Sequence, residues 1–222
     1  MATDNIRTDN SATLSDIVAQ ALRDKIIHGE LRCGQRLSEA QLSESLEISR
    51  NTLREVFRIL TQERLLEYRP NRGVFVSTPD MACISDIYRV RQLIECQAIA
   101  SAWPGHPAVK AMRQAVEQAL ECQEKHDWNG IGTANMAFHG AIVELADSPR
   151  LSAFYRHISA ELRLAFGLLK NAEHLHIPYM EMNLKLLKLV EAGKTREAAS
   201  VLRAYLEQSE RLFLANFARR NN

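Results

Sequence analysis

The fold of the N-terminal third is decided by the stretch Ser49-Arg50-Asn51-Thr52-Leu53-Arg54-Glu55-Val56. Ser49 is a good N-cap, and the apolar spacing after it predicts a helix that runs to about Glu63. The apolar stripe of this helix consists of Leu53, Val56, Phe57 and Leu60. Arg50, Arg54 and Arg58 recur every four residues, so they lie together on another face. A helix with one apolar side and one arginine-lined side fits between a protein core and a DNA major groove.

Two further helices are predicted upstream of this stretch. Apolar residues from Leu14 onward recur at helical spacing until Gly29, which stops the first helix. Ser38 begins a second, short helix, because it stands three residues before a glutamine as in a capping box. Leu42 and Leu46 form the buried side of that helix.

Downstream of the stretch, the hydrophobic period changes from helical to strand-like. Residues 66–69 and 74–76 are typical of short strands, and the turn residues 70–73 between them predict a hairpin. Three helices followed by a hairpin make a winged helix-turn-helix, which we assign to residues 14–78. Residues 1–13 are polar and are expected to be a disordered N-terminus.

The rest of the chain, residues 79–222, is predicted to be all-helical. Breaks are expected at residues 103–105, 126–132, 148–149 and 172–178 and at Gly193. They separate roughly six helices joined by short loops, which predicts an antiparallel bundle. His174 and His176 fall in one of these breaks and are expected to be solvated. The expected fold class is therefore mainly α, with a winged helix-turn-helix followed by an effector-binding and dimerisation bundle.

Composition limits the functions that the chain can have. Its 28 Lys and Arg residues nearly balance 27 Asp and Glu residues, so a nucleic-acid interface must be a local basic patch. The four cysteines form no CxxC pair and indicate reduced thiols. We find no secretion signal and no apolar run long enough to span a bilayer. The sequence therefore predicts a cytoplasmic protein without membrane contact, associated with the nucleoid through DNA.

The basic patch lies on the predicted third helix and on the hairpin. Residues 48–73 contain six Arg and three Glu. The arginines suit guanine edges or phosphate. Further donors stand at the helix start: Ser49, Asn51 and Thr52. Arg69 and Arg72 flank Asn71 at the hairpin tip, where they suit the minor groove or the DNA backbone. A solvated helix face explains single arginines but not a basic wing tip, so the pattern favours DNA binding.

Three separated blocks resemble the GntR family of bacterial regulators. Residues 34–37, 49–56 and 71–76 are similar to its G-x-x-L, S-R-x-x-(V/L)-R-E-(A/V) and N-R-G-x-x-V patterns, in the same order and spacing. The helical remainder resembles the FCD ligand-binding domain of the FadR-type subgroup. Together the two resemblances cover nearly the whole chain from Leu14 onward.

The resemblance implies roles for individual residues of the winged helix. It implies that Arg50 and Arg54 touch operator bases or phosphates and that Arg36 helps to hold the DNA backbone. It also implies that the wing tip, which includes Gly73, enters the minor groove. Two positions depart from the family pattern: Thr52 replaces a frequent Pro, and Arg64 replaces a usual Gly. The operator sequence therefore does not carry over from the family.

One signature helix of the second domain has two interpretations. Arg91-Gln92-Leu93-Ile94-Glu95 matches an FCD pattern in which the arginine points into the cavity and grips a ligand carboxylate. A guanidinium matches a carboxylate with two parallel hydrogen bonds. The alternative is an ion pair between Arg91 and Glu95 on the helix surface, which would contribute little to stability.

Most FCD domains also hold a divalent metal through an Asp-x3-His pair and two later histidines. The corresponding positions here hold Asn135, His139, Asn183 and Tyr205, so His139 is the only retained ligand. Amides and phenols are poor ligands for zinc, and we expect no cofactor. Polar groups inside a bundle need partners. We therefore expect these four side chains to hydrogen-bond a small polar effector, with Arg91 supplying the positive charge.

The sequence leaves three classes of function to compare. The first is a ligand-responsive repressor, in which a homodimer binds a roughly palindromic double-stranded operator and an organic or sugar acid changes its affinity. The second is a constitutive DNA-binding regulator with a degenerate sensor pocket. The third is an enzyme within the bundle, but the chain has no nucleophile elbow, phosphate loop or HExxH motif. We expect the first class.

Overall fold

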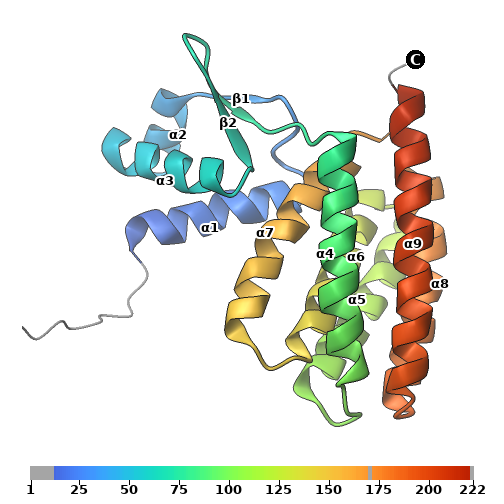
Figure 1. Cartoon of the computed structure of the whole chain (residues 1–222). Coiled ribbons are helices and arrows are strands. Elements are labelled where there is room, and N and C mark those ends of the chain that lie inside the picture. Colours follow the sequence, from blue (N-terminus) through green and yellow to red (C-terminus); the bar gives the residue numbers. More distant parts are fainter. Residues whose placement is uncertain (1–12, 170–171, 221–222) are drawn as a thin grey trace, which may run out of the picture.

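The computed structural model describes residues 13–169 and 172–220 and is predominantly helical (Figure 1). The N-terminal part contains α1 (Leu14–Ile27), β1 (Arg36–Leu37), α2 (Glu39–Ser45), α3 (Arg50–Gln62), β2 (Leu66–Arg69) and β3 (Gly73–Val76). The C-terminal part contains α4 (Met81–Ala100), α5 (Pro107–Glu124), α6 (Trp128–Glu144), α7 (Pro149–Phe166), α8 (Ala172–Glu191) and α9 (Thr195–Arg220). This order confirms a mainly α chain, with a winged helix-turn-helix followed by a helical bundle.

Local sequence sets where the first helices begin. Ser38 and Ser49 cap α2 and α3 as predicted, because each side chain accepts a backbone N–H three residues later. Thr13 caps α1 and forms a capping box with Asp16, whose carboxylate accepts the Thr13 backbone N–H at 3.0 Å. The prediction of disorder was therefore wrong at Thr13, while residues 1–12 lie outside the described residues.

The wing is a three-stranded antiparallel sheet in the order β1-β3-β2. Its β2–β3 hairpin is the predicted one, with Tyr68 opposite Val74. The sequence alone does not predict β1, because two residues are too few to show a strand period. The pairing of β1 with β3 sets Arg36 opposite Phe75, which brings a third arginine-bearing segment to the wing.

Two hydrophobic cores share one helix. The first core lies among α1, α3 and the sheet, with Leu22, Leu53 and Leu60 fully buried. It also includes Ala160 and Leu164 from α7, whereas the second core is built by the helices of the bundle. Figure 1 shows α7 running from beneath α1 along the bundle. This helix therefore joins the winged helix to the bundle by direct packing.

One predicted break between helices is shorter than expected. The break at residues 126–132 ends at Asp127, which caps α6. Gly130 lies inside the first turn of α6, where its N–H donates to Asp127 Oδ1 at 2.9 Å. The same carboxylate and Cys122 Sγ occupy the space that a Cβ would need, so this glycine serves a close approach and not a turn.

The predicted break at residues 172–178 was wrong, because α8 begins at Ala172 and continues through Pro178. His174 and His176 therefore lie on a helix and not in a loop, and their exposure lies outside what the structure describes. A proline removes one backbone hydrogen bond from a helix. The buried side chains farther along α8, among them Tyr179 and Leu186, hold the helix in the core and outweigh that loss.

Candidate DNA interface and effector site

The predicted DNA-reading face of α3 is exposed. Its members Arg50, Asn51, Arg54 and Arg58 are exposed, and Thr52 is half-buried. The apolar stripe on the opposite side is buried, as predicted. Ser49 Oγ accepts the Thr52 backbone N–H at 3.0 Å and lies 2.8 Å from the Thr52 hydroxyl. Both hydroxyls therefore stabilise the start of α3, and the arginines above them face solvent.

The three arginines of α3 differ in their partners. Arg54 Nε lies 3.1 Å from the carboxylate of Glu39 on α2, and Arg58 Nη2 lies 2.6 Å from Glu55. Arg50 has no ion-pair partner among the described residues. Exposed ion pairs contribute little, so a DNA phosphate can replace either carboxylate at small cost. Arg50 is therefore the one arginine of this face that no described carboxylate holds.

The wing carries the remaining DNA-binding candidates: Arg36, Arg69, Asn71, Arg72 and Gly73. The guanidinium carbons of Arg69 and Arg72 lie 4.4 and 5.8 Å from the ring centroid of Phe75. Arg69 also pairs with Glu67. A Cβ on Gly73 would lie 3.7 Å from Arg36 Nε, so Arg36 borders the hairpin. Asn71 and Gly73 have φ of 59° and 98°, the left-handed conformation that a tight turn needs.

The predicted effector residues converge inside the bundle from four helices. They are Arg91 on α4, Asn135 and His139 on α6, Asn183 on α8 and Tyr205 on α9, and all five are buried. Asn183 Nδ2 donates to Asn135 Oδ1 at 2.8 Å, and the Tyr205 hydroxyl donates to the same oxygen at 3.3 Å. His139 Nε2 lies 3.1 Å from the Tyr205 oxygen, so Asn135 Oδ1 and His139 Nε2 compete for the single Tyr205 proton. Hydrogen bonds among themselves therefore provide most of the partners that these buried groups need, and Asn183 Oδ1 is left without one among the described residues.

Glu95, which the sequence analysis did not assign to this site, joins these residues to Arg91. One carboxylate oxygen accepts from Arg91 Nε at 2.7 Å and from the Tyr155 hydroxyl of α7. The other accepts from His139 Nδ1 at 2.6 Å. The side chains of Arg91 and Glu95 are 3% and 0% exposed, so the interpretation as a surface ion pair was wrong.

The helical period of α4 contains the signal that locates Glu95. Tyr88, Arg91, Glu95 and Ile99 follow at steps of three or four residues and share the buried face. Both charged residues are therefore on the face that enters the core. Tyr155 carries no comparable signal, because an aromatic residue in an apolar helical stripe is ordinary core. We call the seven side chains Arg91, Glu95, Asn135, His139, Tyr155, Asn183 and Tyr205 the polar network.

Burial and pairing fix the charges of the polar network. Burial opposes ionisation of Glu95, but the Arg91 guanidinium and the hydrogen bonds from His139 and Tyr155 outweigh it and lower the pKa of Glu95 to about 2. Burial also lowers the pKa of His139, although Glu95 acts in the opposite direction. Burial raises the pKa of Tyr205 and keeps the phenol neutral. At neutral pH, Arg91 and Glu95 are the charged members of the polar network, and their opposite charges give it no net charge.

These donors do not fit a metal ion. Both ring nitrogens of His139 are engaged, one with Glu95 and one with Tyr205. Asn135 and Asn183 hydrogen-bond each other. Across residues 13–169 and 172–220, no group of three or more His, Cys, Asp and Glu side chains is placed to hold a metal. In this arrangement the network is a hydrogen-bonded cluster.

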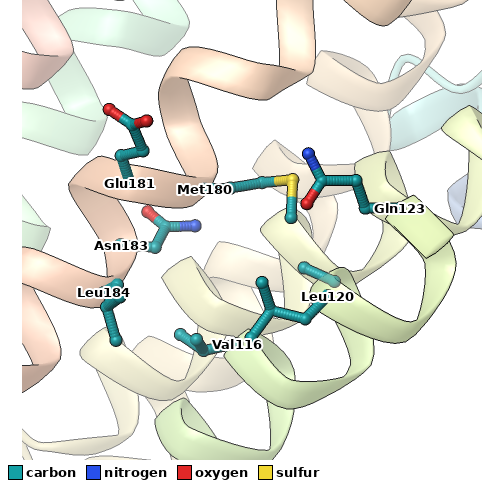
Figure 2. A pocket seen from close by; sticks show the side chains of 8 residues that line it. Val116, Leu120, Gln123, Met180, Glu181, Asn183 and Leu184 are labelled. Atoms are coloured by element: carbon teal, nitrogen blue, oxygen red, sulfur yellow. The ribbon is translucent and has the colours of Figure 1, made fainter.

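A pocket of about 240 Å³ opens beside the polar network, between α5 and α8 (Figure 2). Figure 2 shows Asn183 and Met180 on α8 across from Val116 and Leu120 on α5. Asn183 is buried, and its Oδ1 has no hydrogen-bond partner among the described residues. A buried acceptor without a partner is costly. Asn183 is also the member of the polar network that lines this pocket.

Comparisons with known proteins agree with the two-part architecture. Residues 14–76 match the family model described as bacterial regulatory proteins, gntR family. Residues 86–208 match the FCD domain model. None of the helices within the described part of the chain is long and apolar enough to cross a membrane.

Individual relatives are transcriptional regulators. The chain is 30% identical over 174 residues to the galactonate operon transcriptional repressor of Escherichia coli K12, which covers 68% of this chain and 75% of that protein. It is 27% identical over 132 residues to the HTH-type transcriptional repressor RspR of the same strain, covering 59% and 58%. A crystal structure of a GntR transcriptional regulator from Rhodococcus sp. RHA1 superposes with a TM-score of 0.85 at 37% identity, covering 90% of this chain and 97% of that one.

Proposed function

The chain belongs to the GntR family of bacterial regulatory proteins and carries an FCD domain, and from this premise we propose that it is a repressor whose operator affinity is controlled by a small metabolite. The matched families and relatives are transcriptional regulators. The chain is likewise a DNA-binding transcriptional regulator and not an enzyme. Repression, the effector and the dimer are the parts that belong to the proposal.

The observation that supports the DNA interface is the exposed basic surface shared by α3 and the wing. Arg50 faces solvent without an ion-pair partner among the described residues, and Arg36, Arg69 and Arg72 gather at the hairpin. α3 would read the major groove while the wing tip follows the minor groove. A homodimer would present two such surfaces to two half-sites of a roughly palindromic operator.

The observation that supports an effector site is the polar network and its one buried acceptor without a partner. Arg91 donates to Glu95 through Nε and carries the positive charge of the polar network, which a ligand carboxylate would use. Asn183 Oδ1 would accept from a ligand hydroxyl. A relative named for a galactonate operon makes sugar acids the first class of effector to test.

A second candidate is a constitutive regulator whose sensor site has degenerated. It is favoured by the mutual hydrogen bonding of the polar network, in which Glu95 accepts from Arg91, His139 and Tyr155 of the same chain. Such a protein would bind its operator with an affinity that no metabolite alters.

Thermal unfolding of the chelator-treated protein separates these candidates. Organic and sugar acids are added with and without zinc, because a ligand that binds the native state raises the melting temperature. A zinc-independent rise that Asn183→Leu removes is the expected result. A rise that requires zinc would contradict a metal-free site, and the absence of any rise would favour the constitutive regulator.

Operator binding is measured on a duplex selected from a random library by the full-length protein. Fluorescence anisotropy should show that the stabilising acid weakens binding of the wild-type protein but not of Asn183→Leu. Light scattering should give the mass of a dimer. Operator binding that the organic or sugar acid does not change would contradict the proposed effector control. A monomeric mass would contradict the proposed dimer.

A further inference from the structure

A groove of about 480 Å³ lies outside the polar network, between α5, α6 and α7 and the end of α1. Its wall includes Ile27 and His28 from the winged helix and Tyr155 from α7. Because Tyr155 belongs to the polar network and donates to Glu95, the groove borders the network through this one side chain. The groove therefore touches both domains and the buried cluster.

The floor of the groove contains a glycine that the fold does not explain. Gly140 lies within α6, where glycine is less favourable than alanine. A Cβ built on Gly140 would find no atom within 4 Å, so no neighbouring segment requires its absence. Ala137 and Ala141 also line the groove, and their small side chains leave space above the helix. The space above Gly140 is therefore available to something other than this chain.

The walls of the groove carry polar groups without partners. Ser159 is 9% exposed, and its hydroxyl makes no hydrogen bond with any described residue. Arg156 on α7 and Glu144 on α6 are exposed, and neither forms an ion pair within the described part of the chain. Among the described residues, the groove thus sets a cation and an anion without ion-pair partners, together with serine hydroxyls, around an apolar floor.

We propose that this groove binds a zwitterionic α-amino acid with a large apolar side chain. Its carboxylate pairs with Arg156, its ammonium group pairs with Glu144, and its side chain lies over Gly140. A cavity of roughly 150 Å³ holds benzene, so about three times that volume holds an amino acid with an aromatic bicycle. Both charges of the groove are then matched by one ligand, which neither a simple acid nor a simple amine achieves.

A ligand at this position would stabilise the contact between the two domains. Arg163 Nε donates to the Ile27 carbonyl at 2.8 Å, and Asn129 Nδ2 donates to the His28 carbonyl at 2.7 Å, so the end of α1 is already tied to the bundle. The amino acid would add contacts to the same end of α1. The groove is therefore a second ligand site, distinct from the polar network, and its test does not depend on the effector proposed above.

Isothermal titration calorimetry on the full-length protein tests the class of ligand. The probes are L-tryptophan, 3-indolepropionate, which lacks the ammonium group, and tryptamine, which lacks the carboxylate. L-Tryptophan is expected to bind, and each analogue should bind roughly tenfold more weakly or worse, because it loses one charged hydrogen bond. Equal binding of either analogue would overturn the zwitterionic class.

Variants test the location. Gly140→Leu fills the groove and should abolish tryptophan binding, while Gly140→Ala should raise the melting temperature because nothing opposes the added methyl group. Arg156→Gln should weaken binding, and Arg150→Gln, an exposed arginine of the same helix outside the groove, should not. Unchanged tryptophan affinity in Gly140→Leu, or no binding to the wild-type protein, would overturn the proposal. A change from dimer to monomer in Gly140→Leu would also overturn it, since the groove would then be an interface between copies.

Discussion

The DNA-binding surface and the polar network use arginine in opposite ways. On α3 and the wing the arginines are exposed, apart from the half-buried Arg69, and their ion pairs reach solvent. In the bundle Arg91 is buried and shares Glu95 with His139 and Tyr155. An exposed arginine exchanges one partner for another at little cost, whereas a buried charge cannot lose its partner. Mutations on the DNA-binding surface should therefore change operator affinity one residue at a time. Loss of one charged member of the polar network should destabilise the whole network.

The largest expected effect is the loss of stability in Glu95→Ala. This change leaves the guanidinium of Arg91 buried without a counter-charge, which should lower the free energy of unfolding by about 3–5 kcal/mol. The midpoint of urea unfolding measures it. The double variant Arg91→Met with Glu95→Leu is the control, and it should recover most of the loss because no charge remains buried. Equal destabilisation in both variants would show that the unpaired charge of Arg91 is not the cause of the loss.

The next effect is on DNA and leaves stability unchanged. Arg50→Ala should weaken operator binding by roughly 10- to 100-fold, because Arg50 faces solvent and carries no ion pair within the described residues. Fluorescence anisotropy at fixed salt measures the change, and urea unfolding should be unaltered. Arg211→Ala, an exposed arginine on α9, is the matched control. A similar loss in both variants would indicate a general effect of charge.

Low pH should reduce the stability of the fold through the polar network. The unfolded chain protonates His139 near its ordinary pKa of 6.5, but burial lowers the pKa of His139 in the fold, so stability falls as pH drops below 6.5. Glu95 adds a second loss as pH falls from its ordinary pKa of 4.5 towards about 2. Urea unfolding across this range measures both steps. Burial also lowers the pKa of the half-buried His157, so His139→Gln should reduce the first step and leave the part due to His157. An unreduced first step in His139→Gln would rule out His139 as a cause.

The smallest effect concerns the competition between Glu39 and DNA for Arg54. Glu39→Gln frees Arg54 from its 3.1 Å ion pair and should tighten operator binding by about two- to fivefold. Glu44→Gln removes the same charge from the same helix without touching Arg54, so it controls for the change in net charge. Anisotropy titrations compare the two variants. Equal tightening would mean that the ion pair does not matter.

The winged helix could be predicted in detail because its signals are local. Ser49 accepts a hydrogen bond three residues away, the apolar stripe of α3 repeats every turn, and the hairpin turn needs left-handed residues such as Asn71. All of these act within a few residues of the chain. β1 was not predicted, because this two-residue strand is defined by its pairing with β3 and not by a local pattern.

The bundle was predictable as a set of helices and only partly as a site. Arg91, Asn135 and the other predicted effector residues do lie together, which resemblance to a family anticipated. Glu95 was placed on the surface by one interpretation, and Tyr155 was not singled out. The continuation of α8 through Pro178 also depended on packing that no local signal encodes.

The sequence by itself determined the helix starts, the basic face of α3 and the order of the two domains, because caps, turns and helical periods depend on neighbouring residues. Only the tertiary structure decided which charges are buried, which arginines are paired and where the chain leaves room for a ligand. Glu95 accepts from three helices at once, and the groove over Gly140 is walled by four. Such environments are properties of several segments packed together, so no spacing within one segment can specify them.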